Sequence, residues 1–296
     1  MFKDCDYLQR SLNGMKLSVF SVSMPEYMPE VAVKKLSALG YDGVEWRCLP
    51  VDPEKANEAP SFWGNNCCTI DENTILDKID EIKGLCKDAG LQMPSLGSYL
   101  GCEHHDRIEK VAKACALLGI PMMRVSPYNY NGSVNYRELF AKAVEDYAVC
   151  EKIAKEYNVK MVMEMHMGNL TPSASAAYRL ASNFDPKYIG VLYDIGNMVN
   201  EGYEQYQVGL ELLGEYLAHV HVKNAKWVCK ESSFLKTASW AVESAPLWEG
   251  SADFDQFIAA LKHVGYDGWL SVEDFTMGVS TDEKIANNIK YLKKIL

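Results

Sequence analysis

Short apolar runs and amphipathic segments alternate along the whole chain. The segments between the runs have apolar residues three and four positions apart, as in Ile108, Val111, Cys115 and Leu118, which is the period of an amphipathic helix. The runs themselves are nearly continuous, which is typical of parallel strands buried on both faces. The pattern therefore predicts eight strand–helix units, with strands at about 16–22, 42–47, 92–97, 121–126, 159–165, 188–193, 217–222 and 268–274.

A repeated junction precedes several of these runs. The tetrapeptide Gly-Tyr-Asp-Gly occurs at 40–43 and again at 265–268, and related junctions place Gly or Asn where a helix would end in a left-handed residue. A doubly wound open sheet would instead want a glycine-rich turn after its first strand, and the segment 19–25 contains no glycine. We therefore predict a single-domain α/β protein over 1–296, a (β/α)8 TIM barrel.

Two long segments, 48–71 and 223–252, lack a clear helix or strand pattern. They follow the second and seventh predicted strands, so both should lie at the carboxyl-end face where barrel active sites form. They carry aromatic residues, among them Trp63, Trp240 and Trp248. We interpret them as irregular mouth loops that cover a substrate or form a contact in a homo- or hetero-oligomer.

The composition narrows the class of protein. The chain has 296 residues, 48% of them hydrophobic, and a formal net charge of −10, which argues against disorder and against nucleic acid as a partner. No apolar stretch reaches the roughly 18 residues needed to span a membrane. The nine cysteines are an odd number, and Met1–Cys5 does not read as a signal peptide. We expect a reduced, cytoplasmic protein that does not bind a membrane.

Four late strands end in side chains that bind metals. Glu164, Asp194, His221 and Glu273 stand at the ends of the fifth to eighth runs, and a barrel brings the carboxyl ends of its strands around one mouth. Any one of these acids alone would be expected to form a salt bridge, but four at matching positions favour a metal site. Three carboxylates and one imidazole suit a divalent cation, with Mn²⁺ preferred and Mg²⁺, Co²⁺ or Zn²⁺ as alternatives.

The motifs around these residues resemble the xylose-isomerase-like TIM-barrel superfamily of sugar phosphate isomerases and epimerases, over essentially the whole chain. The motifs are Met163-Glu164-Met-His166, Leu192-Tyr-Asp194-Ile-Gly-Asn197, His219-Val-His221-Val-Lys223 and Leu270-Ser-Val-Glu273. The resemblance implies that His221, rather than His219, is a ligand. It also implies that Glu164 and Glu273 bind the metal and exchange protons with a keto-sugar between them. A cation beside a carbonyl acidifies the neighbouring C–H bond, which gives this chemistry an independent physical basis.

Two further candidates follow the ligands by two positions. His166 should share the inward direction of Glu164 by strand alternation, and could act as an additional base, hold a sugar hydroxyl or orient Glu164. Lys223, two residues after His221, could reach a substrate oxygen by the same alternation. An exposed loop lysine is the alternative interpretation.

Other polar residues near strand ends are weaker candidates. Glu45 and Arg124 end the second and fourth runs, where they could contact substrate at the floor or rim of the site, or pair with charges on neighbouring strands. His104 and His105 open the third predicted helix. Adjacent histidines cannot both point inward, so we expect solvated loop residues.

Two positions depart from the ketohexose 3-epimerases that the chain resembles. Those enzymes usually carry His where this chain has Asn197, and Arg where it has Trp227. The polar clamp for a free ketohexose is thus altered. An aromatic residue there suits a bulkier substrate such as a glycoside with an aromatic aglycone, although a core or lid tryptophan explains it equally well.

Four functions are consistent with these observations to different degrees. The first is a metal-dependent isomerase or epimerase of a small-molecule keto-sugar. The second is a lyase of the same family, an inosose dehydratase or an enzyme that cleaves 3-keto-glycosides. The third is a non-catalytic sugar-binding barrel or subunit. The apurinic-site endonuclease branch is disfavoured, because it needs more ligands, three metals and a DNA-binding surface.

Overall fold

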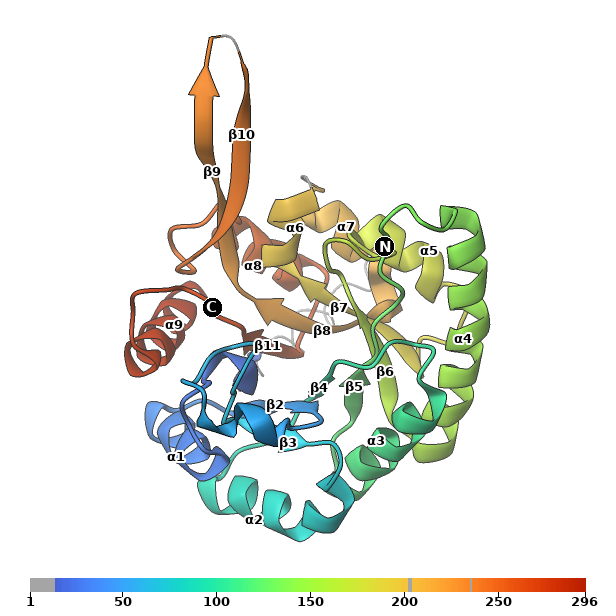
Figure 1. Ribbon diagram of the computed structural model, residues 1–296, viewed down its shortest axis with the longest axis vertical. Helices are drawn as coiled ribbons and strands as arrows, with labels where there is room; N and C mark the ends of the chain where they lie inside the picture. Colours follow the sequence, from blue (N-terminus) through green and yellow to red (C-terminus); the bar gives the residue numbers. More distant parts are fainter. Residues whose placement is uncertain (1–13, 202–203, 235) are drawn as a thin grey trace, which may run out of the picture.

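A closed barrel of parallel strands, ringed by helices, forms the centre of the molecule (Figure 1). The computed structural model describes residues 14–201, 204–234 and 236–296. Within them, the barrel strands are β1 Lys16–Phe20, β2 Gly43–Leu49, β4 Leu96–Ser98, β5 Met122–Arg124, β6 Lys160–Glu164, β7 Ile189–Asp194, β8 Leu217–Val222 and β11 Trp269–Val272. Each strand overlaps a predicted apolar run, although β4 begins four residues later than the run at 92–97. The predicted (β/α)8 barrel is confirmed.

The strand order explains how distant residues meet at one mouth. Strand β1 pairs in parallel with both β2 and β11, which closes the sheet. The remaining neighbours follow in the order β11, β8, β7, β6, β5, β4, β2. A short strand, β3 (Thr69–Asp71), adds to β2 outside the closed ring and ends the segment 48–71.

The helices cover the outside of the barrel. Their junctions are as predicted: Gly40 ends the first helix with a φ of +80°, and Asn158 ends the fourth with a φ of +52°. The predicted apolar stripe Ile108, Val111 and Cys115 is fully buried. The helices are α1 Pro29–Leu39, α2 Ile79–Ala89, α3 His105–Leu118, α4 Tyr136–Tyr157, α5 Ala174–Ala181, α6 Ile195–Glu201, α7 Tyr206–Leu213, α8 Phe254–His263 and α9 Thr281–Ile295.

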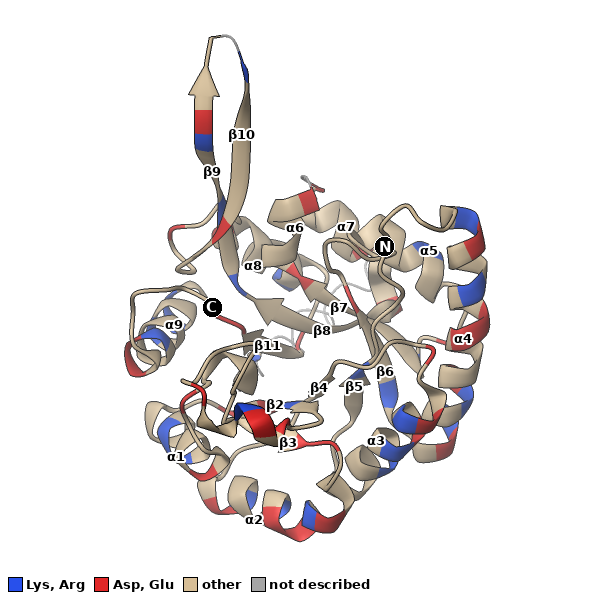
Figure 2. Cartoon of the chain, in the orientation of Figure 1, with Lys and Arg blue, Asp and Glu red and all other residues tan. Residues whose placement is uncertain are grey.

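Charged side chains are spread over the outer helices, with both signs interspersed (Figure 2). Among the described residues, none of the helices is both long and apolar enough to cross a membrane. Of the cysteines in the described ranges, most are buried, Cys67 is half-buried and Cys229 is exposed, and all are free thiols. The segment Met1–Cys5 lies outside the described residues.

The prediction of an irregular loop over 223–252 is wrong. Strands β9 (Asn224–Ser233) and β10 (Lys236–Ala245) form an antiparallel hairpin that projects away from the barrel (Figure 1). Lys226 lies opposite Glu243 in its register, and Lys230 also forms an ion pair with Glu243. Opposite charges and β-branched or aromatic residues on facing strands stabilise such a ribbon.

Candidate metal centre and active site

Four adjacent strands place acidic and imidazole side chains at the barrel mouth. Glu164 ends β6, Asp194 ends β7, His221 lies in β8 and Glu273 follows β11 directly. Nδ1 of His221 lies 3.7 Å from Glu164 Oε1, 3.9 Å from Asp194 Oδ2 and 3.8 Å from Glu273 Oε2. All four residues are buried, and one ligand atom from each lies within 4.8 Å of the others. The structure therefore brings the predicted ligand set together.

The donor atoms fit a divalent cation. A cation with bonds of about 2.1 Å separates its neighbouring ligand atoms by roughly 3 to 3.5 Å, only slightly less than the 3.7 to 3.9 Å around His221 Nδ1. That nitrogen is buried and has no hydrogen-bond partner among the described residues, although three carboxylates face it. A positive charge at this place would satisfy the nitrogen and the three acids together.

Lys223 contributes a positive charge to the same group of acids. Its Nζ lies 2.8 Å from Asp194 Oδ2 and 2.5 Å from Glu273 Oε2, and its side chain is 14% exposed. The lysine chain passes close to Gly196, where an added Cβ would lie 2.3 Å from Lys223 Cγ. The absence of a side chain at Gly196, two residues after Asp194, therefore leaves room for the lysine chain to reach the acids.

Arg124 and Asn197 hold the first glutamate of the site. Arg124 Nη1 donates to Glu164 Oε2 at 2.6 Å, and its Nε donates to the Ser98 carbonyl at 2.9 Å. Asn197 Nδ2 donates to Glu164 Oε1 at 3.3 Å and to the Met165 carbonyl at 3.0 Å. Glu164 is thus fixed at both carboxylate oxygens, and Arg124 neutralises its charge inside the barrel.

Burial and charge shift the pKa values of these groups in different directions. The pKa of Asp194 is raised to about 6, mainly by burial. Lys223 lowers it, whereas the neighbouring acids Glu273 and Glu164 raise it further. Burial alone would raise the pKa of Glu164 too, but Arg124 holds it well below its usual range. Burial opposes the charge of Lys223, yet Asp194 and Glu273 raise the pKa of its ammonium above its ordinary value. The lysine and Glu164 are therefore charged at neutral pH.

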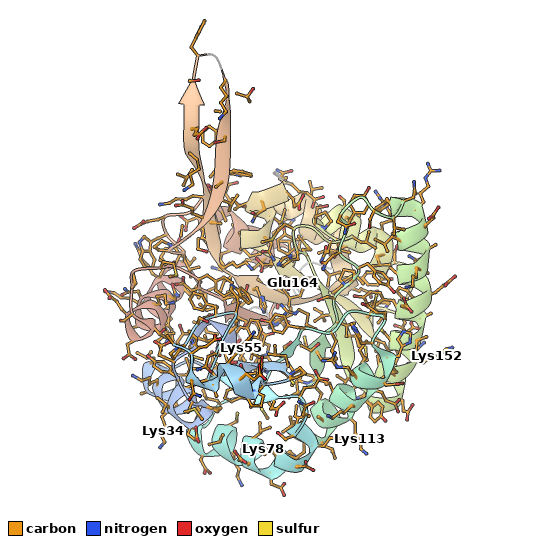
Figure 3. All side chains as sticks on the ribbon, in the orientation of Figure 1. Lys34, Lys55, Lys78, Lys113, Lys152 and Glu164 are labelled. Carbon is orange, nitrogen blue, oxygen red and sulfur yellow. The ribbon has the colours of Figure 1, made fainter. Side chains whose placement is uncertain are left out.

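A cavity of about 620 Å³ opens above this cluster and has Glu164, Lys223 and Glu273 in its wall, a size typical of small-molecule sites. In Figure 3, Glu164 lies inside the ring of helices, whereas Lys34, Lys78, Lys113 and Lys152 lie on the periphery. One side of the cavity is aromatic: the rings of Trp63 and Phe275 are 5.0 Å apart, and those of Trp63 and Tyr99 are 6.5 Å apart.

The other predicted site residues divide into two groups. His166, Asn197, Arg124 and Lys223 all line the cavity, and so does His104, for which we had expected only a solvated role. His166 Nδ1 lies 2.7 Å from the Met167 carbonyl oxygen. Within the described residues, no hydrogen bond joins His166 to Glu164.

Glu45 and Trp227 do not reach the cavity wall. Glu45 lies deeper in the barrel, where its Oε2 contacts the rings of His219 and His221. Of the two roles considered for Glu45, the structure therefore shows pairing with side chains of another strand rather than a place in the cavity wall. The indole N–H of Trp227 donates to the Val199 carbonyl at 2.8 Å, which turns the ring toward a separate small cavity beside α6.

Some lining residues were not anticipated from the sequence. Phe275 follows Glu273 by two positions, so strand alternation alone could have identified it. Tyr99 directly follows β4 and packs on Arg124, with the guanidinium carbon 4.5 Å from the ring centre. Val242 and Ser244 come from β10 of the hairpin. No signal pointed to them, because the hairpin itself was not predicted.

The fold and the site together define a class: a parallel (β/α)8 barrel with a candidate divalent-cation site of three carboxylates and one imidazole at its mouth. The chain belongs to the xylose isomerase-like TIM barrel family, whose sequence model matches residues 33–295. The resemblance inferred from the strand-end motifs is thereby confirmed.

Curated relatives cover part of the chain. Inosose dehydratase from Geobacillus thermodenitrificans (strain NG80-2) is 32% identical over 148 residues, which are 48% of this chain and 47% of that protein. Inosose dehydratase from Bacillus anthracis (strain CDC 684 / NRRL 3495) is 27% identical over 187 residues, 60% of this chain and 57% of that protein. The chain thus spans only about half the length of these relatives. These relatives are enzymes, which supports the prediction of an enzyme of this family.

Solved structures match over nearly the whole chain. The apo form of 3-keto-D-glucoside 4-epimerase from E. coli has a TM-score of 0.70 at 15% identity, covering 95% of this chain and 99% of that one. The IolI protein, crystallised with a zinc atom, has a TM-score of 0.70 at 17% identity, covering 95% and 98%. At these identities the matches establish the fold alone.

Proposed function

We propose that this protein removes a proton from the carbon next to the ketone of a sugar or a cyclic polyol, with the help of a divalent cation. The observation that carries the proposal is the placement of Glu164 and Glu273. They stand at the two ends of the row β6, β7, β8, β11, and both carboxylates lie within 4 Å of His221 Nδ1. Two carboxylates can thus approach one substrate from two sides.

Glu164, Asp194, His221 and Glu273 would hold the cation. When bound, it supplies positive charge that stabilises the enolate oxygen of the reacting ketone. We propose Mn²⁺, because three of the four ligands are carboxylates. Zn²⁺ is the main alternative, supported by the zinc atom in the structure of the IolI protein.

The chain's own residues carry the proton. Glu273 takes it from the carbon, and the electrons of the C–H bond move toward the ketone oxygen. Lys223, 2.5 Å from Glu273 and in the cavity wall, donates to a substrate oxygen. Glu164, ionised and fixed by Arg124, first takes up a proton from a substrate hydroxyl or from solvent and then delivers it to the carbon from the other side, which inverts the centre. Glu273 releases the abstracted proton in exchange, so both carboxylates return to their starting state. The burial of both carboxylates keeps water from competing.

A second outcome of the same step is elimination. Once the proton is on Glu273, the electrons can expel a group from the next carbon, and a protein acid protonates that group as it leaves. His166 in the cavity wall is suited to this donation. The relation to inosose dehydratases and the aromatic side formed by Trp63, Tyr99 and Phe275 support this candidate. Its substrates would be inososes or 3-keto-glycosides.

The experiment that tests the proposal uses the Mn²⁺-loaded protein in D₂O, incubated separately with ketohexoses, inososes and 3-keto-glycosides. Deuterium in recovered or epimerised sugar, detected by NMR, supports isomerase or epimerase chemistry. A dehydrated product or a released aglycone supports the lyase. Binding of these compounds with neither result would favour the non-catalytic barrel and contradict the proposal.

Replacing Glu273 provides the matched variant for this assay. We expect Glu273→Gln to lower the rate of deuterium exchange or product release by about 10²- to 10⁴-fold, the range for loss of a general base. Glu103→Gln is the control, because Glu103 also lines the cavity but is not one of the four clustered ligands. Equal rates in wild type and Glu273→Gln would exclude the proposed role of Glu273.

We also infer a cytoplasmic location and an oligomeric assembly. The buried free thiols support a reducing environment. Phe234 and Trp240 on the hairpin are exposed, which supports a contact between this ribbon and another subunit.

A further inference from the structure

A second buried polar group lies next to the candidate metal site and is not part of the cavity wall. It consists of Glu45, His219 and His221, all fully buried. Nε2 of His221 lies 2.9 Å from Glu45 Oε2, and Nε2 of His219 lies 3.1 Å from the same oxygen. One carboxylate oxygen from β2 thus joins two imidazoles from β8 across the barrel.

This contact determines which nitrogen of His221 carries hydrogen. An ionised carboxylate oxygen can only accept hydrogen bonds, so the Nε2 that faces it must be the donor. A neutral imidazole that carries its hydrogen on Nε2 has a free lone pair on Nδ1. Nδ1 is the atom that faces Glu164, Asp194 and Glu273 at 3.7 to 3.9 Å, the position of a metal ligand.

The surroundings of Nδ1 would otherwise favour the opposite arrangement. Three carboxylates near that nitrogen attract a hydrogen to it, because each can accept a hydrogen bond. A neutral ring with its hydrogen on Nδ1 would point that hydrogen at the place of the cation. Its Nε2 lone pair would then face the barrel interior. Glu45 opposes this tautomer by making Nε2 the better place for the hydrogen.

We propose that Glu45 is a positioning residue that keeps the hydrogen of His221 on Nε2 and so leaves Nδ1 free to bind a divalent cation. His219 donates to the same oxygen and steadies the Glu45 carboxylate. This inference rests on the metal site of the proposed function but not on the reaction, so it is tested by binding without substrate.

Titration calorimetry with Mn²⁺ on the full chain compares wild type, Glu45→Gln and a control. We expect Glu45→Gln to bind Mn²⁺ about 10- to 100-fold more weakly, the usual effect of losing a partner behind a metal ligand. The matched control is Glu72→Gln. Glu72 is also a buried carboxylate, but it accepts two hydrogen bonds of 2.7 Å from Arg107 and does not line the cavity. Its replacement should leave Mn²⁺ affinity unchanged.

The tautomer of His221 is a readout that general loosening of the structure would not reproduce. In the metal-free protein, at a pH where the ring of His221 is neutral, ¹⁵N NMR should show the hydrogen on Nε2 in wild type and a shift of that hydrogen toward Nδ1 in Glu45→Gln. Glu45→Asp keeps the carboxylate and should bind Mn²⁺ more tightly than Glu45→Gln. If the amide variant does not fold, the aspartate variant still provides the test, with an affinity below wild type and Nε2–H retained.

The outcomes separate this inference from the proposed function. A folded Glu45→Gln with wild-type Mn²⁺ affinity and tautomer would overturn the role of Glu45 alone. Equal weakening in Glu45→Gln and Glu72→Gln would also overturn it, as would wild-type affinity in Glu45→Asp when the amide variant does not fold. A wild-type protein that binds no Mn²⁺ would instead remove the metal site itself, and the proposed function with it.

Discussion

Two halves of the barrel contribute different chemistry to the same mouth. Strands β6, β7, β8 and β11 form a ligand arc that supplies all four candidate metal ligands. Strands β1, β2, β4 and β5 form a support arc, which supplies side chains that contact those ligands. Arg124 pairs with Glu164, Glu45 contacts His221, and Phe20 stacks on the His221 ring at 5.3 Å between centroids.

The difference shows how a barrel can separate binding from positioning. The ligand arc gathers negative charge, which is unfavourable in a buried site unless it is compensated. Part of the compensation comes from the guanidinium of Arg124 in the support arc, and part comes from Lys223, which follows β8 in the ligand arc. Glu45 and Phe20 of the support arc instead position the ring of His221. Glu45 and Phe20 reach His221 from strands that do not pair with β8, whereas Arg124 reaches Glu164 from the neighbouring strand β5. A change in one half is therefore expected to be felt in the other.

The largest expected effect comes from breaking the ion pair between the arcs. Arg124→Met leaves Glu164 buried without its partner, and we expect a loss of about 3–5 kcal/mol in the free energy of unfolding. Urea denaturation with a chelator present measures it. Arg124→Lys keeps the charge but loses the planar geometry that bonds both Glu164 and Ser98, so its loss should be smaller. A loss below about 1 kcal/mol in Arg124→Met would show that the arcs are energetically independent.

A smaller effect is expected from overpacking the support arc. A Cβ at Gly97 would lie 2.4 Å from two carbons of the Phe20 ring, and that ring packs on His221. Gly97→Ala should therefore cost about 1–3 kcal/mol in the free energy of unfolding and weaken Mn²⁺ binding in calorimetry. Gly84→Ala in α2 is the control, because an added Cβ meets no atom within 4 Å there. Unchanged Mn²⁺ affinity in Gly97→Ala would contradict the coupling.

The smallest expected effect is the change in Mn²⁺ affinity with each unit of pH, which concerns the ligand arc alone. The pKa of Asp194 is raised to about 6, and a cation binds the carboxylate rather than the acid. Below pH 6 the affinity for Mn²⁺ should fall by at least about tenfold per pH unit. Protonation of His221 acts in the same direction, because Glu45 and Glu164 raise the pKa of its ring despite burial. Calorimetry between pH 5 and 7 (both about one unit from the midpoint) measures it. A flat profile would mean that Asp194 is not a ligand.

In the metal-free protein, the contribution of Asp194 to the free energy of unfolding should change with pH in the direction opposite to the Mn²⁺ affinity. Because the pKa of Asp194 is raised above its ordinary value of 3.8, the folded state binds more protons than the unfolded state between about pH 4 and 6. The contribution of this group to stability is therefore present at low pH and is lost as pH rises through 6. Chelator-treated and Mn²⁺-loaded protein should thus respond to acid in opposite directions at this site.

The ligand arc could be predicted from sequence because its signals are local. Each ligand lies at or near the end of a short apolar run, and a parallel barrel brings the carboxyl ends of its strands together at one mouth. The support arc could not be assigned in the same way. Glu45 lies 174 and 176 positions from His219 and His221, and strand alternation says that it points inward without saying what it meets. Its contact is a property of the closed barrel.

The hairpin of β9 and β10 could not be predicted from the sequence, for a different physical reason. Its register shifts near Ser239, so no uninterrupted alternation of polar and apolar residues runs along both strands. Trp227 was expected at the substrate because it stands where related enzymes have Arg. Its side chain is instead held by the Val199 carbonyl, a contact with a helix that only the tertiary structure could reveal.

The narrow passage beside Gly196 also limits how this site can change during evolution. A methyl group at this position would meet both the side chain and the backbone of Lys223, at 2.3 Å from Cγ and 2.8 Å from the carbonyl oxygen. Shortening the lysine alone would not make room. The two positions must therefore change together, with a new path for the chain where it leaves β8. Relatives with a larger residue here should have lost the lysine charge, and with it the present balance of charge at the mouth.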